Sequence, residues 1–146
     1  MKVLLNLKLT ARVENLQRLM GSVSTCARAE DFNQKKIQEI ELAVEEALVN
    51  IFNYAYPDGP GEVEVNCRAD HDHFMIEIID SGIPFDMTSL PDPDLTADVD
   101  DREIGGLGIF LVKKMVDEVK YRREADRNIL SLIMKKKNPP VRDGQS

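Results

Sequence analysis

Residues 37–56 read IQEIELAVEEALVNIFNYAY, the most informative stretch of the sequence, and they predict a long helix. Its apolar residues recur at the spacing of one helical face, which must pack on a core; they are Ile37, Ile40, Val44, Ala47, Leu48 and Ile51. Glu46, Asn50 and Asn53 follow at i, i+4 and i+7 and therefore share a second, polar stripe of the same helix. Taken alone, this stripe fits either a solvated face or one wall of a pocket.

The segments around this helix alternate between strand and helix patterns. Residues 13–27 have helical spacing, and Asp31 with Gln34 resembles a capping box that opens the long helix. Before and after these helices, every second residue is apolar, which predicts strands over the ranges 3–9, 62–67 and 74–79. Helical spacing returns over residues 107–119, and a final hairpin is predicted over 119–123 and 129–134.

This order of elements predicts the fold class. Strand, helix, helix, two strands, loop, helix and two strands give an α+β fold, a two-layer sandwich. Its mixed, mostly antiparallel sheet is covered on one face by helices. We expect one domain over residues 1–137 and a flexible C-terminal tail over residues 138–146.

Composition excludes several classes of function. The chain has 146 residues with a net charge of −7, so repulsion from phosphate backbones disfavours nucleic acid as a partner. It has neither an apolar run long enough to span a membrane nor a signal-peptide pattern, and we expect a cytoplasmic protein. Cys26 and Cys67 fit reduced, packed thiols, while His71 and His73 fit a turn better than a metal site.

Two further motifs are candidates for ligand binding. Asp80 shares a strand face with Ile76 and Ile78 and should point inward, where a buried carboxylate needs hydrogen-bond donors such as the amine of adenine. Gly82 would let the backbone approach a flat base. A simple turn that ends a strand explains Asp80-Ser81-Gly82 equally well.

The second motif is glycine-rich. Gly105-Gly106-Leu107-Gly108 opens a predicted helix, where free backbone N–H groups and the helix dipole favour phosphate. The alternative is a flexible hinge that leads from a loop into the helix.

Together, in this order, the three motifs resemble the N, G1 and G2 boxes of the Bergerat-fold, histidine kinase-like ATPase superfamily. The motifs are Glu46-Ala47-Leu48-Val49-Asn50, Asp80-Ser81-Gly82 and Gly106-Leu107-Gly108. Within it, the small size and the run from Gly105 to Val112 are most similar to the anti-sigma factor serine/threonine kinases. The resemblance extends from the first strand to Met134.

The resemblance implies a role for each motif residue. Glu46 would be the catalytic base and Asn50 the Mg²⁺ ligand, with ATP as the bound nucleotide. Asp80 would read adenine with Gly82 beside the base. The residues expected near the phosphates are Asn53, Arg102, Gly105, Gly106, Leu107 and Gly108. Residues 86–104 would form an ATP lid.

The same resemblance implies a function in a partner-switching system. We expect an ATP-dependent protein serine kinase that binds a sigma factor or another output protein, phosphorylates a STAS-domain anti-anti-sigma protein, and forms a homodimer. Two alternatives stay open. One is an ATP-binding regulatory module without kinase activity, suggested by Pro84 in the G1 box and by the lack of a clear match to a lid arginine. The other is a stand-alone histidine-kinase-like catalytic domain.

Overall fold

A computed structural model of the chain describes residues 1–91 and 104–136. The expected tail, residues 138–146, and most of the expected lid lie outside this range. The elements, in chain order, are β1 (Lys2–Thr10), η1 (Val13–Asn15), α1 (Leu16–Ala29), α2 (Gln34–Tyr54), β2 (Glu62–Ala69), β3 (His73–Asp80), η2 (Met87–Ser89), α3 (Ile104–Met115), β4 (Glu118–Glu124) and β5 (Arg127–Lys135).

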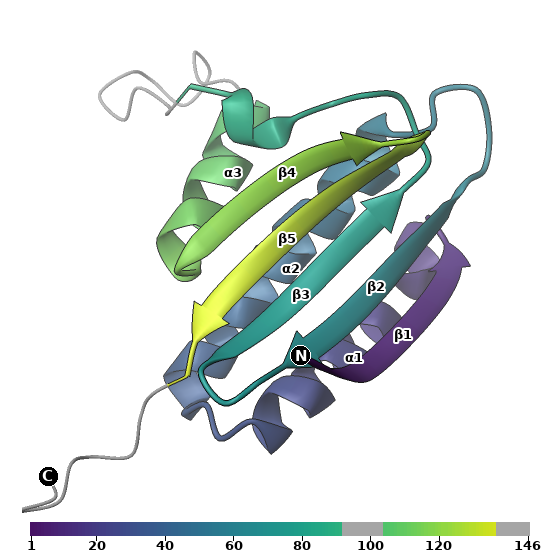
Figure 1. The fold of residues 1–146 in the computed structure, drawn as a ribbon. Coiled ribbons are helices and arrows are strands. Elements are labelled where there is room, and N and C mark those ends of the chain that lie inside the picture. The colour runs from purple at the N-terminus through teal and green to yellow at the C-terminus, as the bar shows by residue number, and fades with distance from the viewer. Residues whose placement is uncertain (92–103, 137–146) are drawn as a thin grey trace, which may run out of the picture.

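The five strands form one sheet in the order β1-β2-β3-β5-β4. Each of the four pairings is antiparallel. All three α-helices lie on the same side of the sheet, with α2 behind its centre (Figure 1). The predicted fold class, a two-layer α+β sandwich, is confirmed, and among the described strands the mostly antiparallel sheet is entirely so.

The core lies between α2 and the sheet. All six residues of the predicted apolar face of α2 are buried, at 8% exposed or less. They meet the inward-facing residues of the central strands, among them Ile76, Ile78 and Leu132. Because the core fixes one side of α2, it also fixes where Glu46 and Asn50 point.

The start of α2 differs from the prediction. Asp31 does not cap the helix; its φ of +65° places it in the left-handed region, in the turn after α1. The side chain of Asn33 instead accepts a hydrogen bond of 2.8 Å from the backbone N–H of Lys36. The capping-box prediction was therefore wrong by two residues, since Asn33 is an equally good cap that directly precedes the helix.

The two cysteines fit the prediction of reduced thiols. Cys26 and Cys67 are both free thiols. Within residues 1–91 and 104–136, no group of three metal-ligating side chains gathers, and no helix is both long and apolar enough to cross a membrane. The helix α3 begins at Ile104, so Gly105 and Gly106 lie in its first turn, as expected for the glycine-rich segment.

Candidate functional site

Glu46 and Asn50, on α2, face Gly108 on α3. A Cβ atom built on Gly108 would lie 3.1 Å from Oε2 of Glu46 and 4.0 Å from Nδ2 of Asn50. Such a contact with Glu46 is tighter than ordinary van der Waals packing, so glycine is the residue that leaves the carboxylate its space. The first and third motifs, which lie more than fifty residues apart in the sequence, therefore meet in space.

The carboxylate of Glu46 is electrostatically perturbed. Its pKa is raised above the ordinary value, first because burial disfavours the charged form and second because the carboxylate of Glu45 lies nearby. A carboxylate with a raised pKa is a better proton acceptor than an ordinary one. Glu46 thus has the property that a general base needs.

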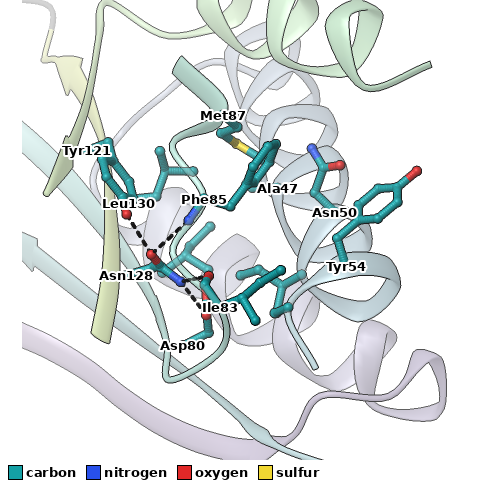
Figure 2. Close-up of a pocket in the computed structure, with 13 residues that line it drawn as sticks. Ala47, Asn50, Tyr54, Asp80, Ile83, Phe85, Met87, Tyr121, Asn128 and Leu130 are labelled. Carbon is teal, nitrogen blue, oxygen red and sulfur yellow. Dashed lines mark hydrogen bonds between the residues drawn. The ribbon is translucent and has the colours of Figure 1, made fainter. Parts of the chain in front are cut away.

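Asp80 ends β3 on the inner face of the sheet and is only 6% exposed. Its Oδ1 accepts a hydrogen bond of 2.8 Å from the backbone N–H of Gly82. It accepts a second, also of 2.8 Å, from Nδ2 of Asn128 (Figure 2). Both of these bonds go to the same oxygen. Among the described residues no hydrogen bond reaches its second oxygen, Oδ2, which can therefore accept one from a ligand that has an N–H donor.

Asn128 is a site residue that the sequence reasoning missed. It lies opposite Asp80 in the pairing of β3 with β5 and is 6% exposed. Its Nδ2 also donates to the carbonyl of Ile83 at 2.9 Å, and its Oδ1 accepts from the Tyr121 hydroxyl at 2.6 Å. The sequence pattern places Asn128 in the turn of the final hairpin. The register of β3 against β5 would have identified Asn128, because the buried carboxylate of Asp80 needs a hydrogen-bond donor on the neighbouring strand.

Asp80 and Asn50 line the same pocket, in which Asp80 and Asn128 lie on the sheet side and Asn50 and Tyr54 on α2 (Figure 2). Most of the lining is apolar, with a few polar groups, which is the usual make-up of a site for a flat organic ligand. The cavity measures about 40 Å³. This volume holds water but no purine base, so a nucleotide can enter only if side chains at the mouth move.

Three large apolar side chains at this pocket are unusually exposed. Tyr54 is 48% exposed, Ile83 49% and Phe85 40%. Exposed apolar groups gathered around one cavity mark a ligand site more often than isolated ones do. Because these side chains are partly exposed, they have room to move when the pocket is filled.

Gly82 has a structural reason to be glycine that differs from the expected one. A Cβ atom at Gly82 would lie 2.2 Å from the carbonyl oxygen of Ala55, at the end of α2. The next backbone N–H, that of Ile83, donates to the same carbonyl at 3.0 Å. The close approach is thus to α2, and contact of Gly82 with a base stays a prediction.

The other predicted site residues are placed as follows. Asn53 is exposed on α2 and does not line the pocket that holds Asp80. Gly105, Gly106 and Leu107 belong to the first turn of α3, where backbone N–H groups lack helical partners. Arg102 lies outside the described residues. The structure therefore brings together Glu46, Asn50 and Gly108 at one place, and Asn50 with Asp80 around one pocket.

The antiparallel sheet with its helices on one face, together with these three motifs, is the arrangement expected of a histidine kinase-like ATPase, and comparison with known proteins shows this family. A family model described as "Histidine kinase-like ATPase domain" matches residues 9–134, and the chain belongs to that family. Among solved structures, the histidine kinase domain of the Erythrobacter litoralis EL346 blue-light activated histidine kinase has a TM-score of 0.53 at 17% identity. The match covers 83% of this chain and 61% of that one, and it shows the likeness of the fold alone.

Curated relatives narrow the resemblance further. The chain is 30% identical over 121 residues to a protein named serine-protein kinase RsbW from Listeria monocytogenes, a match that covers 80% of this chain and 77% of the relative. A serine-protein kinase RsbW from Bacillus cereus is 23% identical over 130 residues, covering 86% and 81% respectively. The resemblance to the anti-sigma factor kinases inferred from the motifs is confirmed.

Proposed function

We propose that the chain is an ATP-dependent protein serine kinase that acts as an anti-sigma-type regulator. The observation that carries the proposal is that Glu46, Asn50 and Gly108 converge at one end of a site whose other end is the buried Asp80. The end at Asp80 offers a hydrogen-bond acceptor for the adenine base. The end at Glu46 offers a proton acceptor beside the start of α3. The relatives named serine-protein kinase support the same reaction class.

At the base end, Asp80 would accept a hydrogen bond from the exocyclic amine of adenine through Oδ2. The two donors on Oδ1, Gly82 and Asn128, hold the carboxylate in one orientation. A carboxylate fixed in this way distinguishes a base with an amine from a base with a carbonyl at the same position, because the second would leave a buried acceptor unpaired.

At the phosphate end, Glu46 would accept the proton of a serine hydroxyl of the substrate protein. The hydroxyl oxygen then forms a bond to the γ-phosphorus while the bond from that phosphorus to the bridging oxygen breaks, and ADP leaves. The first turn of α3 offers its free backbone N–H groups to the phosphates. Positioning and electrostatics dominate this kind of reaction.

The residues present fit ATP and Mg²⁺. Gly108 leaves an uncrowded space in front of Glu46 and Asn50, and any larger residue there would fill it. The carboxamide of Asn50 supplies a neutral oxygen of the kind that Mg²⁺ prefers. When bound, the ion would offset the negative charge of the phosphates, which matters in a chain whose net charge is −7.

As partners we propose a STAS-domain antagonist, as the phosphorylated substrate, and a sigma factor or comparable output protein. Both follow from the resemblance to RsbW, as does the homodimer that we expect.

The test is transfer of radiolabel from ATP to a small STAS protein of the same organism. We expect label on its serine with the wild-type chain, no label with Glu46→Gln, and label with Glu45→Gln. Glu45 is the matched control because it is the adjacent carboxylate on the same helix. Mg-ATP binding without label on any STAS protein would favour the ATP-binding module instead, and label on histidine would favour the histidine-kinase-like alternative.

A further inference from the structure

We propose that Tyr56 is a positioning residue for base recognition: its hydroxyl holds the Asp80-Ser81-Gly82 turn against the end of α2 and thereby sets the preference for a base that has an exocyclic amine. The inference rests on the proposed function, because it concerns the same nucleotide. Tyr56 itself does not line the pocket that contains Asp80. It acts on the base only through the backbone that carries Asp80.

One hydroxyl group joins two segments that lie far apart in the sequence. The hydroxyl of Tyr56 accepts a hydrogen bond of 2.7 Å from the backbone N–H of Ser81. It donates a bond of 2.5 Å to the backbone carbonyl of Glu62, the first residue of β2. The turn after β3 is thus tied to the start of β2 as well as to α2.

The ring of Tyr56 is also held in place by the backbone of Gly61. A Cβ atom built on Gly61 would lie 2.2 Å from Cε1 of Tyr56. Only glycine allows so close an approach, so the backbone at Gly61 packs directly on the ring. The hydroxyl therefore stands at a fixed point rather than sampling several rotamers.

Two independent contacts then fix the turn at neighbouring residues. Tyr56 holds Ser81, and the carbonyl of Ala55 holds Ile83 at 3.0 Å. The carboxylate of Asp80, immediately before Ser81, is held by Asn128. If the Tyr56 bond is lost, the backbone at Ser81 can shift, and with it the Gly82 N–H that donates to Oδ1 of Asp80. Asn128 and Ala55 still hold their partners, so we expect the carboxylate to turn about the remaining Asn128 bond without loss of the fold.

The protonation state of Tyr56 suits this role. Its pKa is raised above the usual value, first by burial, with the negative charge of Asp80 adding to the effect. The hydroxyl therefore keeps its proton at neutral pH and serves as donor and acceptor at once.

The experiment compares Tyr56→Phe with Asp80→Asn and with Ser24→Ala. Ser24→Ala is the matched control, because it also removes one hydroxyl bond, of 2.6 Å to Glu41, from a side chain that is 5% exposed and lies outside the described pockets. Two quantities are measured: the affinity for Mg-ATP relative to Mg-ITP, whose base has a carbonyl in place of the amine, and amide hydrogen exchange at Ser81 without nucleotide.

With Tyr56→Phe we expect the ATP:ITP affinity ratio to fall by about fivefold, the factor expected for one hydrogen bond, and exchange at Ser81 to speed up by about tenfold. Ser24→Ala should change neither. If Asp80→Asn abolishes the preference for ATP but Tyr56→Phe leaves the ATP:ITP ratio unchanged, the inference about Tyr56 is overturned and the proposed base recognition by Asp80 stands. If Asp80→Asn keeps the preference, or the wild-type chain binds no ATP, the proposed base recognition fails and the inference falls with it.

Discussion

Burial of Glu46 has two opposite effects. It raises the pKa of the carboxylate, which suits the proposed role as a general base, and it makes the charged form unfavourable in the folded chain. Because its pKa is higher in the folded chain than in the unfolded chain, the carboxylate destabilises the fold once the pH exceeds the folded pKa. We predict that Glu46→Gln raises the melting temperature at pH 7. The gain should shrink toward pH 4, where Glu46 is mostly protonated in both states, and thermal unfolding at the two pH values measures this. A lower melting temperature at pH 7 would contradict it.

Glu45 affects Glu46 through charge alone, which gives a second prediction. Removing the charge with Glu45→Gln should lower the pKa of Glu46, because the repulsion that favours its protonated form is gone. The acidic limb of the pH–rate profile for phosphoryl transfer should therefore move to lower pH. A profile that keeps its position, measured with saturating Mg-ATP, would show that Glu46 does not control this limb.

Gly108 allows a third test, because replacing it with alanine adds a single methyl group beside Glu46. Gly108→Ala places a Cβ atom 3.1 Å from Oε2 of Glu46, so the carboxylate must shift. We predict about a tenfold or greater loss of transfer, since small misplacements of catalytic groups are costly. Stability should not fall, because alanine is the better helix former. Gly21→Ala on α1 is the control, as nothing lies within 4 Å of its added methyl group; equal activity of the two variants would argue against the geometry.

At the scale of elements, α2 is specified by its own sequence. Its buried face was predictable because six apolar residues repeat with helical spacing and no strand pattern competes. Its first residue was not, because Asp31 and Asn33 are both good caps and only the backbone at Asp31, with positive φ, distinguishes them. Similarly, Asn128 was not predicted as a site residue. Its role depends on the pairing of β5 with β3, which the sequence around Asn128 does not specify.

The cap of α2 yields a prediction about stability. Asn33→Ala removes the bond to the N–H of Lys36 and should lower the free energy of unfolding by about 1 kcal/mol in urea denaturation. Asp31→Gly should leave stability unchanged or raise it, because glycine adopts a positive φ without strain. A larger loss of unfolding free energy with Asp31→Gly than with Asn33→Ala would show that Asp31 is the cap.

At the scale of the whole molecule, the sheet brings distant motifs to one site. The order β1-β2-β3-β5-β4 sets Asp80 beside Asn128, and the packing of α2 on α3 sets Glu46 beside Gly108. The sequence predicted the layers, since alternating strand and helix patterns allow few arrangements. It did not predict the strand order or the narrowness of the pocket, which depend on long-range contacts and on where Ile83 and Phe85 come to lie.

We propose that Asp80 and Glu46 serve one bound nucleotide, the first for binding and the second for transfer. Calorimetric titration with Mg-ATP tests it most directly. We expect saturable binding to the wild-type chain and to Glu46→Gln, and markedly weaker binding to Asp80→Asn. Absence of binding to the wild-type chain, or undiminished binding to Asp80→Asn, would contradict it.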